Sequence, residues 1–365
     1  MQRIADSEYL PLLASYVFPG MDLEQVRGFI RSLHTINDFQ LKVMYNVNKK
    51  IIENSITSFT YSGVENIDPQ KKYLFVSNHR DIMLDASLME NILAGHGIET
   101  SEISFGANLM QGQLVIDIGK SNKMYKVERP GGGIREFYLA SLKLSQYLHH
   151  TINEKGQSAW IAQRNGRTKD GLDRTDQGII KMFGMSNPKD LVSAIDDLSI
   201  LPVAVSYEWE PCDFMKAAEL CIKEHGTYTK QPGEDIQSIL SGIQQPKGHV
   251  HFHFCKPLCR AELEQFDAGQ ANDFNRSVAH LIDSRICSAY SLSPNNYIAH
   301  DMLHASSRYS GEYSSEQKAA FERHIGGFDP AQKGCDPVRF REILLGIYAN
   351  PVDSKELFKG TDVSY

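Results

Sequence analysis

The sequence has 365 residues, of which 41% are hydrophobic and 23% are charged, and its formal net charge is -7 at pH 7. This length and composition are typical of a folded globular protein with a sizeable core. The negative net charge argues against a general nucleic-acid binder. The segment from Lys120 to Arg174, however, holds eleven Lys or Arg residues against five Asp or Glu residues. Such a basic segment suits an anionic small ligand, an acidic partner protein or a lipid headgroup surface.

The sequence carries no pattern typical of export or of a membrane span. Its N-terminus, MQRIADSEYLPLL, lacks a basic start, an apolar stretch and a cleavage site, and no run approaches 18 apolar residues. The cysteines form no CxxC pair and are expected to be reduced thiols. They are Cys212, Cys221, Cys255, Cys259, Cys287 and Cys335. A cytoplasmic location is therefore expected.

The first 55 residues are predicted to be helical, because apolar residues recur there at helical spacing. Asp22 ahead of Gln25 is typical of a capping arrangement that starts a helix. A second apolar stripe lies beside lysines, so it could face a bilayer, but core packing is the preferred interpretation. This stripe consists of Leu41, Met44, Val47 and Ile51 beside Lys42, Lys49 and Lys50.

From there to about residue 257, short apolar runs typical of buried strands alternate with helix-like stretches. The predicted strands are Tyr73 to Val76, Ile103 to Phe105, Ala159 to Ala162, Ile200 to Val205, and Val250 to Phe254. The clearest helix follows Gly133, with Ile134, Phe137, Leu144 and Leu148 along one side. The alternation predicts an α/β fold with a mixed, largely parallel sheet flanked by helices.

After Pro257 the pattern becomes helical, with a polar segment rich in Ser, Asn and Tyr between the helices. The helices are expected near Arg260 to Ser288, Ser315 to His324 and Pro337 to Tyr348. We therefore predict three parts: an N-terminal helical segment (1–56), an α/β domain (57–258) and a C-terminal helical extension (259–365).

The first candidate site is the segment from Ser77 to Asp85 (SNHRDIMLD), between a predicted strand and a helix. The carboxyl end of a strand is where α/β sheets present reactive groups. A neutral histidine there can take a proton from an attacking hydroxyl, and a nearby carboxylate can fix its tautomer. A histidine that only caps the helix is the alternative for His79.

The second candidate site is the loop after the predicted strand at Trp160, which contains Arg164, Asn165, Gly166 and Arg167. Guanidinium groups form paired hydrogen bonds with phosphate oxygens, and a glycine lets the backbone approach a ligand. This composition predicts a phosphate site, with a solvated charged turn as the alternative.

A third segment, from Gly119 to Arg129, places charged residues around apolar ones. If it is a strand, Arg129 points with the apolar face toward a cleft while Lys126 alternates with it. A surface strand with ordinary solvated charges is the competing interpretation. The glycines that follow, 131–133, are expected to be a flexible connector because the P-loop lysine and spacing are missing.

These segments, in this order, resemble the glycerolipid acyltransferases, the family of glycerol-3-phosphate and lysophosphatidic-acid acyltransferases. The family has four sequence blocks in a fixed order. Its first block is Asn-His followed by four residues and Asp, and its second block is an aromatic-apolar stretch that ends in Arg. The family's third block is Glu-Gly-x-Arg-Ser, and its fourth block is a strand with an apolar-Pro-apolar pattern. The matching residues are Asn78-His79 with Asp85, Met124 to Arg129, Asn165 to Thr168, Ile200 to Val205, and the closing Lys256-Pro257-Leu258.

The resemblance implies transfer of a fatty acyl group from acyl-CoA or acyl-carrier protein to a hydroxyl of a glycerol-phosphate or lysophospholipid acceptor, as in phospholipid biosynthesis. His79 would act as the general base with Asp85 as its partner, and no metal or bound cofactor would be needed. The acceptor would be held by Lys126, Arg129, Arg164, Asn165, Gly166 and Arg167. Because lysophospholipid acceptors lie in membranes, the resemblance also suggests a peripheral association with the inner face of the cell membrane.

The sequence departs from the family pattern at three points. Five residues separate His79 from Asp85, so Asp81 is the alternative partner of the histidine, although Asp85 is preferred. Asn165, or Arg164 in the alternative register, stands where the family carries Glu. Arg167 comes one position early, where Thr168 takes the family arginine's place.

Two further motifs could suggest other functions. His79-Arg80-Asp81 matches the start of a kinase catalytic loop, but the accompanying kinase motifs are missing. His249, His251 and His253 would share a strand face, which favours packing over a metal site. The main alternatives are a catalytically silent lipid- or partner-binding protein on the same scaffold, motivated by the missing Glu, and an acyltransferase with an amine acceptor.

Overall fold

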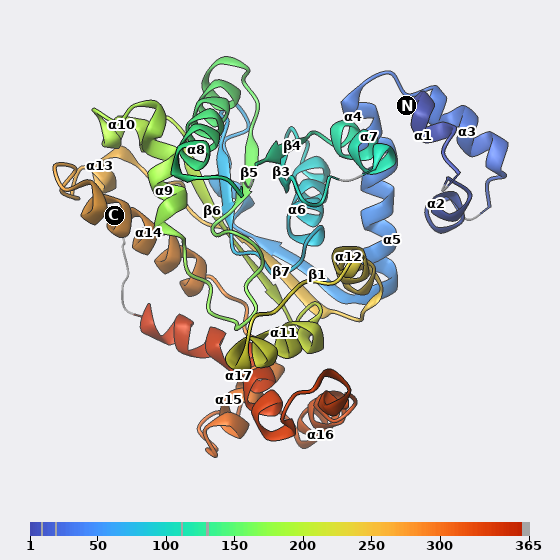
Figure 1. The fold of residues 1–365 in the computed structure, drawn as a ribbon, viewed down its shortest axis with the longest axis vertical. Coiled ribbons are helices and arrows are strands. Elements are labelled where there is room, and N and C mark those ends of the chain that lie inside the picture. Colours follow the sequence, from blue (N-terminus) through green and yellow to red (C-terminus); the bar gives the residue numbers. More distant parts are fainter. Residues whose placement is uncertain (9, 19, 111, 129–130, 360–365) are drawn as a thin grey trace.

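A seven-stranded sheet forms the centre of the molecule in the computed structural model, which describes residues 1–8, 10–18, 20–110, 112–128 and 131–359. The strand order is β1-β7-β6-β2-β5-β3-β4 (Figure 1). The strands are β1 (Ile56–Ser62), β2 (Leu74–Ser77), β3 (Glu102–Gly106), β4 (Met124–Val127), β5 (Ala159–Ala162), β6 (Ile200–Tyr207) and β7 (Gly248–Phe254).

All neighbouring strands pair in parallel except β6 and β7, which are antiparallel. The predicted mixed, largely parallel α/β sheet is therefore confirmed. β2 lies between β5 and β6 and runs parallel to both, so the carboxyl ends of these three strands meet at one edge of the sheet. That edge carries the residues after Ser77, Ala162 and Tyr207.

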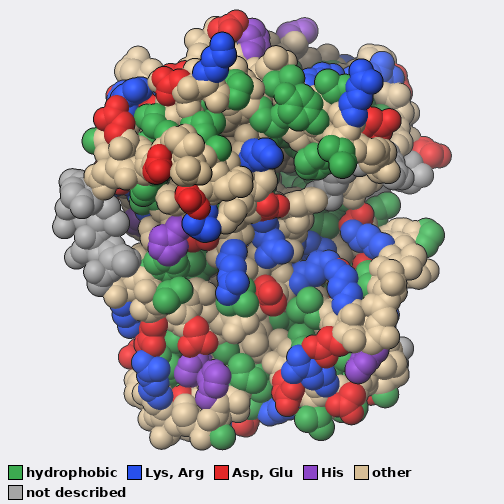
Figure 2. Space-filling view, turned by 60° about the vertical axis from the view of Figure 1, so that its left-hand side comes forward, with side chains coloured by type: hydrophobic (Ala, Val, Ile, Leu, Met, Phe, Trp, Pro, Cys, Tyr) green, Lys and Arg blue, Asp and Glu red, His purple; other side chains and the backbone are tan. Residues whose placement is uncertain are grey.

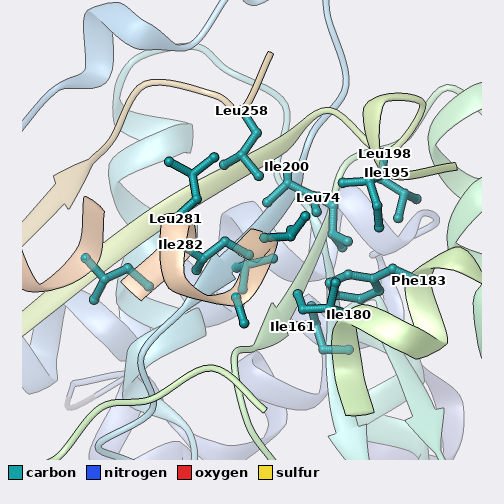
Figure 3. Close-up of a cluster of buried hydrophobic side chains, with 14 of the residues drawn as sticks. Leu74, Ile161, Ile180, Phe183, Ile195, Leu198, Ile200, Leu258, Leu281 and Ile282 are labelled. Carbon is teal, nitrogen blue, oxygen red and sulfur yellow. The ribbon is translucent and has the colours of Figure 1, made fainter. Parts of the chain in front are cut away.

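Both faces of the sheet are covered by helices, because the buried strands place apolar side chains alternately on the two sides. Leu74 and Val76 of β2 belong to one core, shown in Figure 3, and Phe75 belongs to the other. The first core is closed by α8 (Ile134–His149), α9 (Gln177–Phe183), α10 (Leu191–Asp196), α13 (Arg260–Leu263) and α14 (Ala271–Ser288). The second core is closed by α5 (Tyr45–Ser55) and α6 (Leu84–Gly95).

The N-terminal helices form a separate apolar cluster with α7 (Gln113–Ser121). They are α1 (Gln2–Ala5), α2 (Leu10–Val17), α3 (Leu23–Arg31) and α4 (Ile36–Phe39), followed by a π-helical turn, Gln40–Met44, that leads into α5. The predicted cap is confirmed, because Asp22 and Gln25 form a capping box. Met44 and Ile51 are buried while Leu41 is 49% exposed, so most of the second stripe packs in the interior.

A third cluster lies at the C-terminal end of the chain. It consists of α11 (Asp213–His225), α15 (Pro294–Leu303), α16 (Ser315–Ile325) and α17 (Pro337–Leu357). A further helix, α12 (Glu234–Gln244), precedes β7. No helix among the described residues is both long and apolar enough to cross a membrane. The three-part division at residues 56 and 258 stays a prediction.

The structure corrects three predicted elements. Residues 56–62 are an edge strand, β1, which pairs with β7 and was not predicted. The polar segment before residue 315 contains α15, which starts with a Ser293 capping box and Pro294 in its first turn. The apolar side of α8 is buried only toward its end: Leu148 is inaccessible, whereas Ile134 is 91% exposed.

Candidate active site

His79 lies in the loop between β2 and α6, at the sheet edge where β2, β5 and β6 end. Helix α6 begins only at Leu84, so residues 78–83 are not helical. Just ahead of the helix, Asp81 Oδ1 accepts hydrogen bonds from Met83 N at 2.9 Å and Leu84 N at 2.8 Å. The extra residue between His79 and Asp85 is thus accommodated in this loop.

Asp85 is the carboxylate that contacts His79. His79 Nδ1 lies 2.9 Å from Asp85 Oδ2, which also accepts from the backbone N–H groups of Arg80 at 2.6 Å and Asp81 at 2.9 Å. The hydroxyl of Tyr207, at the end of β6, donates to Asp85 Oδ1 at 2.8 Å. Because an ionised carboxylate only accepts hydrogen bonds, Nδ1 carries the proton, which leaves a lone pair on Nε2. A neutral imidazole in this tautomer can act as a base.

The ring of His79 is held at its edge by Trp160 of β5. The two ring centroids lie 5.7 Å apart in an edge-to-face arrangement. Trp160 is fixed in turn, since its indole N–H donates to Ser77 Oγ at 3.0 Å. The His79 side chain retains 14% exposure, while that of Asp85 has none. The imidazole is therefore oriented from two sides and still reaches the surface.

The loop after β5 is attached directly to the histidine. Thr168 N donates to His79 O at 2.8 Å. Gly166 has φ +77°, a left-handed conformation that favours glycine, and its Cβ position is open. Arg164 is partly buried and its Nη1 contacts Leu172 O at 3.4 Å, whereas Asn165 is exposed. The sequence-predicted loop thus lies beside His79.

Arg167 and Asp81 each bring to the site one buried polar atom that has no hydrogen-bond partner within the described part of the chain. These atoms are Arg167 Nη1 and Asp81 Oδ2. Burial and the Asp85 charge raise the pKa of Asp81, and the Arg167 charge opposes this. Arg167 also lies beside Cys212, whose pKa is raised by burial and lowered by the Arg167 charge.

Helix α12 covers Asp81. A Cβ atom on Gly242 would lie 2.1 Å from Asp81 Oδ2, so a larger residue would force α12 or the Asp81 side chain to shift. Burial lowers the pKa of nearby Lys247 to about 8, although the Asp81 charge raises it. The side of the site around Asp81 is therefore enclosed and sparsely solvated.

Asp173 joins the two loops through a buried network. Its Oδ2 accepts hydrogen bonds from Asn78, Arg80 and Tyr290, and its Oδ1 accepts from Thr168 at 2.6 Å. Arg80 Nη2 lies 2.7 Å from Asp173, and Arg80 Nη1 lies 3.1 Å from Glu210. Burial acts to raise the pKa of Asp173, but the Arg80 charge and the hydrogen bonds outweigh it, so the pKa is lowered.

The residues predicted from the third segment are not brought to His79. Lys126 lies on β4, at the far end of the sheet, and its side chain is 51% exposed and paired with Glu128 at 2.5 Å. Three strand spacings separate β4 from β2, roughly 14 Å. Arg129 lies outside the described residues.

Tyr207 and Asp173 are site residues that sequence reasoning missed. Tyr207 is the last residue of an apolar strand, β6, that runs parallel to β2. A residue at the carboxyl end of such a strand is expected at the same sheet edge as His79. Asp173 follows the arginine-rich loop without a motif of its own. Its contacts reach 93 to 117 residues away, to Arg80 and Tyr290, and no local pattern indicates them.

The histidines of β7 form a ladder with the neighbouring strand instead of a metal site. Thr60 Oγ lies 2.6 Å from His249 and 2.8 Å from His251, and Ser62 Oγ lies 3.0 Å from His251 and 2.8 Å from His253. Desolvation and its two histidine neighbours lower the pKa of His251 to about 4. Desolvation also lowers the pKa of His253.

One face of the molecule concentrates positive charge. Figure 2 shows Lys and Arg side chains gathered in a hollow across the middle of this face, with hydrophobic side chains above it. A hollow lined in this way attracts anions.

Similarity to known proteins is found in the structure of this chain. No family model matches the sequence, and no curated protein matches it. The chain is similar to the crystal structure of the 1-acyl-sn-glycerophosphate (LPA) acyltransferase PlsC from Thermotoga maritima, at 13% sequence identity and a TM-score of 0.41. The similarity covers 79% of this chain and 96% of that chain. The function proposed below is therefore argued from the geometry of this chain.

Proposed function

We propose that this protein is an acyltransferase that moves a fatty acyl group from an acyl-CoA or acyl-carrier-protein thioester to a hydroxyl of a glycerol-phosphate or lysophospholipid acceptor. The observation that carries the proposal is the contact of His79 Nδ1 with Asp85 at 2.9 Å, at a strand end to which an arginine-bearing loop is attached. The charge of that loop and the four sequence blocks described above support the acceptor class.

The proposed reaction needs one base that later acts as an acid. His79 Nε2 takes the proton of the acceptor hydroxyl while the oxygen attacks the thioester carbonyl carbon. The C–S bond then breaks, and the sulfur leaves as a thiol with the proton from the imidazolium. Asp85 keeps the ring oriented and stabilises its charged form, and Tyr207 and two backbone N–H groups hold Asp85 in place.

Arg167 is the proposed binder of the acceptor phosphate. A guanidinium forms strong, geometrically fixed hydrogen bonds with phosphate oxygens. In Arg167, the buried Nη1 lacks a hydrogen-bond partner within the described residues. Asn165, which stands in place of a glutamate, can hydrogen-bond a glycerol hydroxyl but carries no charge. The acceptor is thus expected to be held by its phosphate more than by its hydroxyls.

The test is a thiol-release assay on the purified full chain. The protein is incubated with a long-chain acyl-CoA and, separately, with glycerol-3-phosphate, lysophosphatidic acid and amino-acid acceptors, and the acylated product is identified by mass spectrometry. We expect acceptor-dependent thiol release with a phosphate-bearing acceptor. The matched variants are His79→Ala and His150→Ala, because His150 is an exposed histidine bonded to Glu154.

Two results would contradict the proposal. If only the amine acceptors are acylated, the protein is an acyltransferase whose acceptor group is an amine and not a hydroxyl. Silence with every acceptor and with both donor types, in a protein that still binds acyl thioester, would favour the catalytically silent binding protein.

A further inference from the structure

Two imidazoles and a carboxylate meet on the C-terminal helices, outside the site around His79. His300 and His304 lie four residues apart on α15, so they share one face of the helix. Asp353 lies on the neighbouring helix α17. One ligand atom from each of the three residues lies within 4.8 Å of the others. His300 Nε2 is 3.2 Å from Asp353 Oδ1, and the two histidine ring centroids are 4.5 Å apart.

The burial of the three groups differs in a way that suits an ion from solvent. His300 is only 5% exposed, whereas His304 and Asp353 are exposed and give a path of entry. His300 Nδ1 is buried and has no hydrogen-bond partner among the residues that the structure describes. Because Nε2 is the nitrogen that faces Asp353, it is the ligand atom, and its lone pair is available to an ion when Nδ1 carries the proton.

We propose that His300, His304 and Asp353 bind a transition-metal dication of the Zn²⁺ class. Zn²⁺ takes His nitrogen and carboxylate oxygen at about 2.0–2.2 Å in tetrahedral geometry, which places ligand atoms roughly 3.4 Å apart. The contact between His300 and Asp353 is already near this spacing, and His304 needs a small closing movement. Mg²⁺ and Ca²⁺ prefer all-oxygen ligand sets and suit two imidazoles poorly.

The ion would pin α15 to α17. The two helices are already joined by Asn296, whose Nδ2 donates to Tyr348 O at 2.8 Å. One turn before Asp353, Asn350 Nδ2 donates to Asp170 O at 2.7 Å, which fixes the loop that carries Asp173. An ion at Asp353 therefore stabilises the helix that supports this loop. The proposal is independent of any reaction at His79.

The experiment is a metal titration of the full chain. Chelator-treated, dialysed protein is titrated with ZnCl₂ and, in parallel, with MgCl₂ by calorimetry, and its thermal unfolding is followed. We expect one Zn²⁺ per chain and a rise in Tm of roughly 5 °C when free Zn²⁺ is 100-fold above its Kd. MgCl₂ should leave the Tm unchanged.

Three variants separate this site from the other histidine cluster. His304→Ala and Asp353→Asn should each weaken Zn²⁺ binding about 100-fold or more, because each removes a direct ligand. His251→Ala is the matched control, since it breaks the β7 ladder and should leave the affinity unchanged. Loss of binding in His251→Ala with retention in His304→Ala would overturn the proposal. The absence of one-to-one binding in the ZnCl₂ titration would overturn it as well.

Discussion

The two halves of the candidate site differ in how completely their polar atoms are satisfied. In the base half, formed by His79, Asp85 and Tyr207, the Asp85 carboxylate accepts four hydrogen bonds. In the loop half, formed by Arg167 and Asp81, the described residues offer no partner to Arg167 Nη1 or Asp81 Oδ2. Both halves lie at the same sheet edge, and Thr168 N–H to His79 O joins them.

The difference has a physical consequence. A fully bonded group is held in one geometry before any ligand arrives, which is what a general base needs. A buried polar atom without a partner costs free energy, and it regains that energy when a ligand supplies the missing hydrogen bond. The base half is thus suited to chemistry and the loop half to binding.

The largest expected effect comes from breaking the junction between the halves. Asp173→Ala removes the carboxylate that pairs with Arg80 and leaves a buried guanidinium with one fewer counter-charge. Loss of one partner of a buried ion pair costs about 3–5 kcal/mol, so the free energy of unfolding should fall by that amount in urea titrations. Asp170→Ala, in the same loop, should cost less than about 1 kcal/mol. Similar losses of unfolding free energy in Asp173→Ala and Asp170→Ala would mean that the Asp173 network does not join the two halves.

The second effect addresses the base half alone. His79→Ala should lower the turnover in the thiol-release assay by about 100-fold or more, the scale of a positioned general base, with little change in the urea midpoint. His150→Ala should retain wild-type turnover. A fall of less than about 3-fold in His79→Ala would remove the base half from the reaction.

The comparison also explains which parts of the site could be predicted from the sequence. Asp85 lies six residues from His79, so their pairing is visible in the local pattern. Tyr207 and Asp173 contact residues about a hundred positions away, and such pairings are set by the order of strands, which a single sequence does not specify. The arginine loop could be placed beside His79 only because both segments follow predicted parallel strands.

The same distinction holds for the fold. Buried strands such as Ala159–Ala162 were predicted with their bounds, because a continuous apolar run is a strong signal. β1 was missed because its side chains are mostly exposed, and pairing with β7 at the sheet edge stabilises it. α15 was missed although Ser293 and Pro294 are an available start signal. The polar composition of this segment favoured a loop over a helix in the sequence-based prediction.

A third, smaller effect tests the loop half. Arg167→Ala should raise the KM for the acceptor by about 10-fold or more and change kcat by less than about 3-fold, because the phosphate that Arg167 is proposed to bind stays bound throughout the reaction. The measurement is acceptor-dependent kinetics at saturating acyl-CoA. Arg174→Ala is the matched control, since Arg174 is an exposed arginine of the same loop. Equal losses of kcat in Arg167→Ala and His79→Ala would contradict the division between the halves.

The smallest effect is a pH dependence of stability that belongs to the loop half. Burial raises the pKa of Asp81, so the folded protein holds a proton that the unfolded chain loses at lower pH. Stability from this group is therefore present below the ordinary Asp pKa, near 3.9, and is lost as the pH rises above it. Asp81→Asn keeps an oxygen that can accept from Met83 N and Leu84 N but cannot ionise.

The urea midpoint of Asp81→Asn should consequently decline less than that of the wild type as the pH rises above about 4. Arg167→Ala should have the opposite effect, because the Arg167 charge lowers the pKa of Asp81 and its removal makes ionisation costlier. Parallel pH profiles in all three proteins would show that Asp81 and Arg167 do not interact in the folded state. Diverging profiles, with Arg167→Ala steepest, would mean that the Asp81 carboxylate and the Arg167 guanidinium stabilise each other in the folded protein.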